Sequence, residues 1–368
     1  MPILHVIPSF AKGGAENVLK KLLTSPDLKG DHVVVCLKGE TGNSRDLETY
    51  GIKVFHLNLC LKKIFNIFKF KKILAEVNPR ILQGWMYHSN FICFFVNIIY
   101  RGKFKVYWNI RRTYDKSKNT KILTKFLAKI SSYFSRFISL IIYPSNESLE
   151  SHVKVGYSYN NSIVIENGCD EKIFKPDPDI RKSIRNYLKI ETHQILIGYI
   201  ARFHLIKGYD NFIKACSLIA KGHQDLKFIM IGRGFNNTNK ILMDILEENG
   251  IAEKTILLDE IDNVNEYLTA IDLFISCSYC EGFCNTLAEA MLTGIPAIAT
   301  DVGNSKDIIL SSEALIPSGD IQALEKEISN FLSLSQKERD KIGHESRRKI
   351  IKNYSLTKMT RLYNNIYY

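Results

Sequence analysis

The chain has no hydrophobic run long enough to cross a lipid bilayer. Its longest apolar runs, Phe91 to Tyr100 and Phe137 to Tyr143, fall well short of the roughly 20 residues that a membrane-spanning helix needs. Met1 leads into the apolar run Ile3 to Ile7 with neither a basic segment before it nor a small-residue cleavage site after it, so we see no secretory signal. We therefore expect a cytoplasmic protein.

Other absences narrow the class of protein further. Low-complexity tracts are missing and the 368 residues include only 9 prolines, which argues against a largely disordered chain. The 8 cysteines are scattered, mostly through apolar segments, as is typical of reduced, buried thiols rather than of a disulfide framework. Only Cys277, Cys280 and Cys284 cluster, and no fourth ligand with zinc-like spacing follows them. We accordingly predict no metal site.

Acidic residues are scarce in the first half of the chain. Residues 1–175 contain 27 Lys and Arg against 13 Asp and Glu, whereas the remainder contains 23 against 25. Residues 51–136 alone hold 18 basic and 2 acidic residues, interleaved with aromatic and aliphatic ones. This half should attract anionic surfaces. We expect Leu61 to Lys72 and Lys121 to Ser135 to rest on anionic lipid as amphipathic segments, the alternative being a solvated charged face.

What is present predicts an α/β protein of two domains, because 368 residues at roughly 150 per domain give about two separate cores. Short buried strands such as Ile3 to Ile7 and Lys105 to Asn109 alternate with helical patterns, which predicts a parallel sheet covered by helices. Turn formers and prolines between Glu166 and Pro178 interrupt this series, and a second one begins near Ile195. We predict two doubly wound, Rossmann-like domains, residues 1–170 and 171–353, with a C-terminal helix 354–368 that packs back on the first.

Two loops that follow strands carry features of an anion-binding site. In open α/β sheets, ligands lie at the carboxyl ends of the strands. Gly13 and Gly14 stand between the first strand and its helix, where they let a phosphate or a sugar approach the backbone, although a tight turn would explain them equally well. Arg202 and Lys207 follow the first strand of the second domain, and such cations suit a nucleotide diphosphate at a cleft between the two lobes.

Two more loops complete the set. The segment Ile231-Gly232-Arg233-Gly234 resembles half of a glycine-rich nucleotide loop, which alone is a weak signal. The segment Glu281 to Met291 places Glu281 in a loop, where it suits sugar hydroxyls, and Glu289 near a helix start, where it suits a ribose. Thr286 and Glu289 also have the spacing of a capping box, so Glu289 could instead satisfy backbone amides.

Together the four loops resemble those of the retaining glycosyltransferase family four, of the bacterial surface-polysaccharide type, which has the two-lobed GT-B fold. The resemblance spans nearly the whole chain and is strongest in the second half. It is carried there by an ordered series of motifs, namely Gly198 to Gly208, Gly232 to Gly234, Glu281 to Met291, Gly294-Ile295-Pro296 and Asp301-Val302-Gly303. Residues Asn167 to Asp170, with Phe174 and Pro176, look like the interdomain hinge of the family.

The resemblance implies a role for each matching residue. Arg202 and Lys207 would hold the donor diphosphate, Glu281 would contact the donor sugar, and Glu289 would bind the ribose. His88 falls where the family often has a polar residue near the acceptor, although a lone histidine is more often a packed one. The other residues of the implied donor site are Gly13, Gly14, Gly232, Gly282, Phe283, Cys284, Asn285 and Thr286. Of these, Phe283, Asn285 and Thr286 would offer backbone amides to the phosphate at a helix start.

The resemblance also implies the reaction: a retaining, metal-independent, front-face transfer of a hexose or N-acetylhexosamine from a UDP- or GDP-sugar, without a cofactor. The acceptor would be a glycan, which we expect to be lipid-linked at the inner face of the cytoplasmic membrane. Cys280 and Cys284 depart from the small or polar residues usual in the donor loop, which leaves the donor sugar open. The alternatives are a sugar-nucleotide epimerase of similar fold and, through the basic segment, a nucleic-acid-binding protein.

Overall fold

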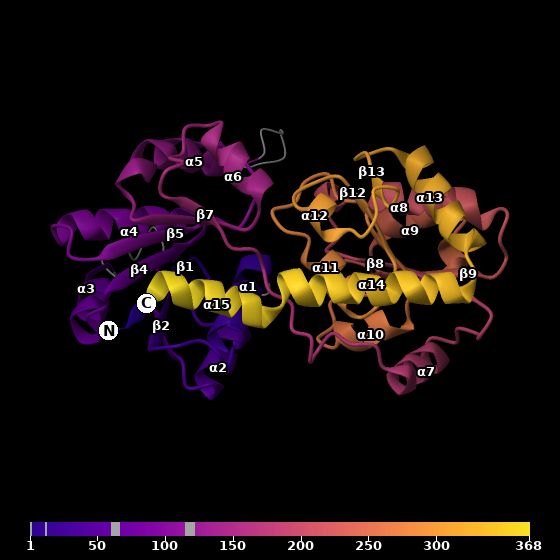
Figure 1. Ribbon diagram of the computed structural model, residues 1–368, viewed down its shortest axis with the longest axis horizontal. Coiled ribbons are helices and arrows are strands. Elements are labelled where there is room, and N and C mark those ends of the chain that lie inside the picture. Colours follow the sequence, from indigo (N-terminus) through magenta and orange to yellow (C-terminus); the bar gives the residue numbers. More distant parts are fainter. Residues whose placement is uncertain (1, 12, 60–66, 115–121) are drawn as a thin grey trace. The chain divides into compact units, whose positions relative to one another are not determined.

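The computed structural model describes residues 2–11, 13–59, 67–114 and 122–368 (Figure 1). They divide into two compact units, residues 1–168 with 356–368 and residues 169–355. The boundaries expected from the sequence, 170 and 354, each lie two residues away from these. Among the described residues, no helix has the length and the apolar character that crossing a membrane would require.

Unit 1 is built on a seven-stranded parallel sheet in the order β3-β2-β1-β4-β5-β6-β7. All residues of β1 and β4 are buried, as expected of central parallel strands that helices cover on both faces. The strands are β1 (Ile3–Ile7), β2 (His32–Cys36), β3 (Lys53–His56), β4 (Ile81–Trp85), β5 (Lys105–Asn109), β6 (Leu140–Tyr143) and β7 (Ser162–Val164).

The helices of unit 1 cover both faces of this sheet over two apolar clusters. The last helix of the chain, α15, completes one of them, because Tyr363 and Tyr367 are fully buried and Asn109 donates to the hydroxyl of Tyr363 at 2.7 Å. The helices are α1 (Gly14–Leu23), α2 (Gly42–Thr49), α3 (Ile67–Val77), α4 (Met86–Ile99), α5 (Ile122–Phe134), the 3-10 turn η2 (Ser135–Phe137), α6 (Asn146–Val153) and α15 (Leu356–Tyr367).

Unit 2 repeats the plan with a six-stranded parallel sheet in the order β10-β9-β8-β11-β12-β13. Two apolar clusters again fill the spaces between the sheet and its helices. The strands are β8 (Ile195–Ile200), β9 (Leu226–Ile231), β10 (Thr255–Leu258), β11 (Leu273–Ser276), β12 (Ala297–Thr300) and β13 (Leu315–Ile316). The helices are α7 (Pro178–Tyr187), η3 (Leu205–Lys207), α8 (Tyr209–Ala220), α9 (Lys240–Glu248), η4 (Ala252–Lys254), α10 (Val264–Ala270), α11 (Asn285–Leu292), α12 (Ser305–Ile308), α13 (Ile321–Ser333) and α14 (Gln336–Tyr354).

Each sheet has one place where the strand order reverses. In unit 1 the chain proceeds outward from β1 in one direction and from β4 in the other, and in unit 2 it does so from β8 and β11. Loops after two such neighbouring strands leave in opposite directions, so they open a crevice at the carboxyl ends. The predicted fold of two doubly wound, Rossmann-like sheets is therefore confirmed, and each unit has its own place for a ligand.

Candidate functional site

The candidate donor site of unit 2 lies at the carboxyl ends of β8 and β11. Lys207 ends the short turn η3 after β8, and Glu281 lies in the loop after β11. Lys207 Nζ is 2.5 Å from Glu281 Oε1, and the two side chains are only 24% and 15% exposed. Ser278, a residue that the sequence analysis missed, donates its hydroxyl to the same oxygen at 2.7 Å. The site thus holds a partly buried cation and anion in contact.

A glycine and a main-chain hydrogen bond hold these two loops together. Gly208 has φ +69°, and a Cβ placed on it would lie 1.8 Å from the carbonyl oxygen of Cys277, so a larger residue would push the loops apart. The amide of Tyr279 donates to the carbonyl of Ile206 at 2.8 Å. The backbone therefore fixes the separation of Lys207 from the β11 loop.

The predicted glycine loop lies directly against the loop that carries Arg202. Gly232 has φ +132°, and a Cβ there would lie 2.0 Å from the carbonyl oxygen of Ala201. The amide of Phe203 donates to the carbonyl of Arg233 at 2.9 Å and ties the loops after β8 and β9 to each other. The Arg202 side chain is exposed beside them. Its charge is thus available at the edge where Lys207 lies.

Asp259 is a second residue that the sequence analysis missed, although it directly follows β10. Its carboxylate accepts from the amides of Gly234 at 3.0 Å and Glu260 at 2.8 Å, and from the side-chain amide of Asn236 at 2.7 Å. These donors lower the pKa of Asp259, because they stabilise its charged form. The sequence offered one indication of its role, namely that an acidic residue directly follows a predicted strand, but Asp259 belongs to no recognised motif.

Helix α11 begins two residues earlier than the capping-box interpretation requires. Its N-cap is Cys284, whose side chain makes no cap hydrogen bond, and its first residue is Asn285. Thr286 is therefore already inside the helix and cannot cap it, so the capping-box alternative is wrong. Glu289 lies in the second turn of α11 rather than the first, and its side chain is half-buried. Its ribose-binding role stays a prediction.

The amides at the start of α11 are partly occupied. The Cys284 amide donates to the side-chain oxygen of Asn304 at 3.1 Å, and the Asn285 amide donates to the carbonyl of Phe283 at 3.0 Å. Both amides thus have acceptors within the protein, contrary to the expectation that the Asn285 amide would be offered to a phosphate. The remaining predicted phosphate donors at this helix start are the amides of Phe283 and Thr286.

The side chains of this motif divide into core and surface. Phe283 packs edge-on against Tyr354 at a centroid distance of 5.8 Å, and Cys284 is buried with its sulfur 3.0 Å from Ser305 Oγ. Cys284 thus serves the packing of unit 2, and its side chain does not line a surface where a sugar could lie. Cys280 and Gly282 are partly exposed.

In unit 1 the predicted residues follow the two strands where the order reverses. Gly13 caps α1 after β1, Gly14 is the first residue of that helix, and His88 is the third residue of α4 after β4. His88 is exposed, and partial desolvation and the charge of Lys38 lower its pKa. A Cβ on Gly13 would meet the carboxylate of Glu16 at 2.5 Å, and burial raises the pKa of Glu16.

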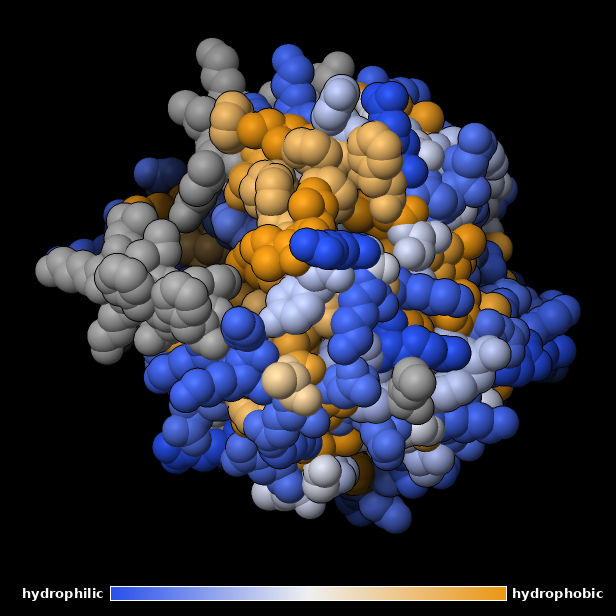
Figure 2. Space-filling model, turned by 90° about the vertical axis from the view of Figure 1, so that its left-hand side faces the viewer, coloured by the Kyte–Doolittle hydropathy of each residue, from blue (hydrophilic) through white to orange (hydrophobic). Residues whose placement is uncertain are grey.

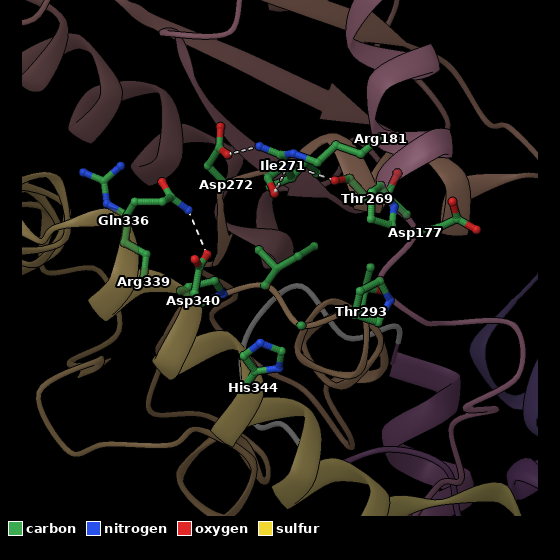
Figure 3. Close-up of a pocket in the computed structure, with 15 residues that line it drawn as sticks. Asp177, Arg181, Thr269, Ile271, Asp272, Thr293, Gln336, Arg339, Asp340 and His344 are labelled. Carbon is green, nitrogen blue, oxygen red and sulfur yellow. Dashed lines mark hydrogen bonds and ion pairs between the residues drawn. The ribbon is translucent and has the colours of Figure 1, made fainter.

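A pocket of about 260 Å³ lies at the other edge of the sheet of unit 2, before β11 and β12 (Figure 3). Arg181 crosses it to an ion pair with Asp272 and donates to the carbonyl of Thr269 at 2.9 Å. Asp272 also accepts from Arg185 at 3.0 Å, and Gln336 donates to Asp340 at 2.8 Å. These charged and polar groups bind one another, so we interpret them as structural contacts that hold α7, α10 and α14 together.

No group of three or more His, Cys, Asp or Glu side chains is placed to hold a metal ion within the described ranges. The structure brings Lys207 and Glu281 into contact and sets the Arg202 and Gly232 loops side by side. It places Gly13, Gly14 and His88 in the other unit. The roles that the sequence assigns to these residues stay predictions.

Comparison with known proteins gives a family match within unit 2. Residues 180–349 match the family described as Glycosyl transferases group 1. The chain is 26% identical over 178 residues to the lipopolysaccharide core biosynthesis mannosyltransferase LpsB of Rhizobium meliloti, covering 46% of this chain and 50% of LpsB. It is 24% identical over 219 residues to the capsular polysaccharide biosynthesis glycosyltransferase CapM of Staphylococcus aureus, covering 58% of this chain and 54% of CapM. The matched region thus spans about half the length of these relatives.

Solved structures agree on the fold over the whole chain. The HepE protein of Anabaena in complex with UDP and glucose superposes with a TM-score of 0.85 at 19% identity, covering 100% of this chain and 99% of that one. Sucrose-phosphate synthase of Thermosynechococcus elongatus gives 0.82 at 15% identity, covering 100% and 98%. With its two parallel sheets the chain has the GT-B fold, and residues 180–349, within unit 2, are similar to the group 1 glycosyltransferases.

Proposed function

We propose that the chain transfers a hexose or N-acetylhexosamine from a UDP- or GDP-sugar to a glycan acceptor in surface polysaccharide biosynthesis, with retention of configuration. The contact between Lys207 and Glu281, at the reversal of strand order in unit 2, is the observation that carries the proposal. A site for a nucleotide-sugar needs a cation for the diphosphate beside an acceptor of hydrogen bonds for the sugar. HepE has been solved with UDP and glucose, which supports a donor of this class.

The charges of unit 2 suit a leaving group that gains negative charge. Lys207 has three N–H donors, so it can hold Glu281 and still donate to a diphosphate. Arg202 adds a second positive charge at the same edge. Cations that interact more strongly with the departing diphosphate than with the bound donor lower the barrier, since only such differential binding accelerates the reaction. We assign leaving-group stabilisation to Arg202 and Lys207, sugar contact to Glu281 and ribose contact to Glu289.

We infer a front-face transfer, in which the leaving phosphate oxygen takes the proton of the attacking hydroxyl. The sugar–phosphate bond breaks and the bond to the acceptor oxygen forms on the same face, so the anomeric configuration is kept. No metal or cofactor is needed in this scheme. We assign the acceptor to unit 1, near Gly13, Gly14 and His88, and we propose that it is lipid-linked at the inner face of the cytoplasmic membrane.

Donor hydrolysis measured across a panel of UDP- and GDP-sugars tests the proposal. One nucleotide-sugar should be hydrolysed slowly alone and faster with the acceptor glycan, and nuclear magnetic resonance should show retained configuration in the product. Activity should survive a chelator. An inverted product would contradict the front-face scheme, and so would a loss of activity in chelator that Mg²⁺ or Mn²⁺ restores. Interconversion of the donor sugar without acceptor would identify an epimerase instead.

A further inference from the structure

One face of unit 1 exposes large apolar side chains on two neighbouring helices. Six such side chains are between 39% and 75% exposed. Exposed apolar side chains are usually scattered singly over a protein surface, so a group of six on one face is unusual. We call this set the α4–α5 face, and its apolar members are Phe95, Ile98, Ile99, Phe126, Tyr133 and Phe137.

The two helices place these side chains side by side. Phe126 and Tyr133 are seven residues apart on α5, and Phe95 and Ile99 are four apart on α4, so each pair lies on one side of its helix. Aromatic packing joins the helices, since the ring of Phe134 lies 5.9 Å from that of Phe95. Figure 2 views unit 1 from this side and shows apolar side chains gathered over a continuous area, with hydrophilic ones to its right and below it.

All charged side chains on the helices that carry the α4–α5 face are basic. The sequences of α4, α5 and η2 contain no Asp or Glu. Arg136 lies over the ring of Tyr133 at 5.1 Å, which places a cation within the apolar area itself. Cations on these helices and on the loop after α4 are Arg101, Lys103, Lys125, Lys129 and Arg136. The face therefore combines protruding hydrocarbon with positive charge.

This combination distinguishes between the partners that could cover the face. A second copy of the chain in a symmetric dimer would set these cations against their own counterparts, which is repulsive. Nucleic acid would use aromatic rings for stacking and basic side chains for phosphates, but it gives the aliphatic Ile98 and Ile99 no partner. A bilayer with anionic headgroups accepts both groups, because hydrocarbon enters the acyl boundary while lysines and arginines remain among the phosphates.

We propose that the α4–α5 face docks on an anionic phospholipid bilayer and inserts the side chains of Ile98, Ile99 and Phe137 into it. This deepens the proposed function, on which it rests for its purpose, because it would bring unit 1 to a lipid-linked acceptor. It also shifts the docking surface from the one expected in the sequence. Residues 61–66 and 121 of that expected surface lie outside the described residues, and the proposed surface combines the end of α4 with α5.

The test is co-sedimentation of the full chain with vesicles of phosphatidylcholine alone and of phosphatidylcholine with phosphatidylglycerol. We expect binding only to the anionic vesicles. The double variant Lys125→Glu/Lys129→Glu should lower the partition coefficient at least 20-fold, at about fivefold for each cation removed. The variant Ile98→Ser/Ile99→Ser should lower it more than tenfold, because two exposed aliphatic side chains leave the acyl boundary.

Variants in unit 2 supply the controls, since they change exposed residues of the same types away from the face. Ile241 is 64% exposed and Lys337 is exposed, so Ile241→Ser and Lys337→Glu should leave vesicle binding unchanged. All these positions lie at the surface, and circular dichroism should show folded variants. Donor hydrolysis without acceptor should be the same in every one, so a failure of docking can be told apart from a failure of the proposed function.

Three outcomes would overturn the proposal. Equal binding to neutral and anionic vesicles would show that the basic side chains do not interact with the lipid headgroups. Binding that responds to the lysine variants but not to Ile98→Ser/Ile99→Ser would show electrostatic adsorption without insertion. A gel shift with single-stranded RNA at physiological salt, abolished by the same lysine variants and joined to absent vesicle binding, would assign the face to nucleic acid.

Discussion

Lys207 and Glu281 form an ion pair at 2.5 Å although 74 residues separate them in the chain. The same carboxylate oxygen accepts the hydroxyl of Ser278, so the two charges are held in place before any ligand arrives. Exposed ion pairs contribute little to stability, and this pair is only partly exposed. We interpret it as an arrangement for binding, in which preformed groups need little reorganisation when a diphosphate and a sugar enter.

The first prediction concerns the charge of Lys207. Lys207→Met keeps the length of the side chain and removes the ammonium group, so it deletes a charge-assisted hydrogen bond of about 1.5–3 kcal/mol to the diphosphate. We expect kcat/KM for the donor to fall roughly 10- to 150-fold. Steady-state kinetics and calorimetric titration with UDP or GDP measure the effect. Lys214 is exposed on α8, and Lys214→Met should behave as wild type; equal losses in both variants would contradict the assignment.

Glu281 should respond differently from Lys207. Glu281→Gln retains the shape and the acceptor oxygen but loses the negative charge, so the free nucleotide should bind at least as tightly as to wild type. Turnover should fall, because neutral amide oxygens make weaker hydrogen bonds to sugar hydroxyls than carboxylates do. The comparison requires nucleotide titration beside donor hydrolysis. A variant that loses nucleotide affinity and keeps its turnover number would reverse the roles that we assign.

The sequence predicted each end of this pair but not their contact. Alternating strands and helical patterns, with polar residues after strands, were enough to place Lys207 after β8 and Glu281 after β11. That the two loops meet depends on β11 pairing with β8, and strand order is a long-range property without a local signal. Asp259 was missed for the same reason, because its value lies in three donors brought by other segments.

Helix boundaries and side-chain burial were the other limits. The motif after β11 suggested a cap at Thr286, whereas the helix is capped two residues earlier, at Cys284, without any side-chain hydrogen bond. The spacing of two residues in the sequence identifies a helix cap only when the capping hydrogen bond is actually formed in the structure. Cys284 looked like a residue that could influence the choice of sugar, but tertiary packing buries it against Ser305. The pattern of residue types did not reveal which side of the loop it would face.

Gly232 should tolerate no side chain. Its φ of +132° is strained for any L-residue, and a Cβ would lie 2.0 Å from the carbonyl oxygen of Ala201. Gly232→Ala should therefore displace the Arg202 loop, lower donor kcat/KM more than tenfold and destabilise unit 2 by about 2 kcal/mol or more. Gly250→Ala is the control, because its φ is +66° but nothing lies within 4 Å. It should cost about 1 kcal/mol in calorimetry and leave kinetics unchanged.

Asp259 should act as a positioning residue for the glycine loop. Asp259→Asn keeps the size of the side chain but replaces one acceptor oxygen by a donor, so at least one of its three hydrogen bonds is lost. We expect KM for the donor to rise about five- to tenfold, while kcat changes little, because the loop is looser but the reacting groups are intact. Asp225→Asn, at the opposite edge of the same sheet, should have no effect. An unchanged KM in Asp259→Asn would show that the loop of Gly232 and Gly234 keeps its conformation without the Asp259 carboxylate.

Unit 1 should become less stable as the pH falls, because it contains the buried histidine His152. His152 Nδ1 lies 2.7 Å from the carbonyl oxygen of Ser148, which can only accept, so this nitrogen carries the proton. The other, Nε2, then accepts the hydroxyl of Tyr87 at 2.6 Å. The pKa of His152 is lowered from 6.5 to about 4: desolvation is the largest cause, the hydrogen bond to Ser148 opposes it, and the charge of Arg112 adds to it. The neutral form is thus built into the core.

The pKa of His152 is lower in the folded state than in the unfolded state, so the unfolded state binds the proton first as the pH falls. The free energy of unfolding is therefore highest above pH 6.5 and decreases as the pH falls towards 4. These two values give a loss of about 2 kcal/mol between pH 7 and pH 5 from His152 alone. Urea unfolding followed by tryptophan fluorescence isolates unit 1, since both tryptophans, Trp85 and Trp108, are buried there. Other buried histidines of this unit, such as His5, also have a lowered pKa, so the wild type by itself does not isolate His152.

The variant His152→Gln separates this contribution from the rest. A glutamine amide can donate to Ser148 and accept from Tyr87, but it does not titrate, so the variant should lose about 2 kcal/mol less than wild type between pH 7 and pH 5. The midpoint at pH 7 fixes the baseline cost of the substitution, and only the difference between the two pH values enters the comparison. Parallel pH profiles of wild type and His152→Gln would show that His152 already binds its proton in the folded state, against the lowered pKa on which this prediction stands.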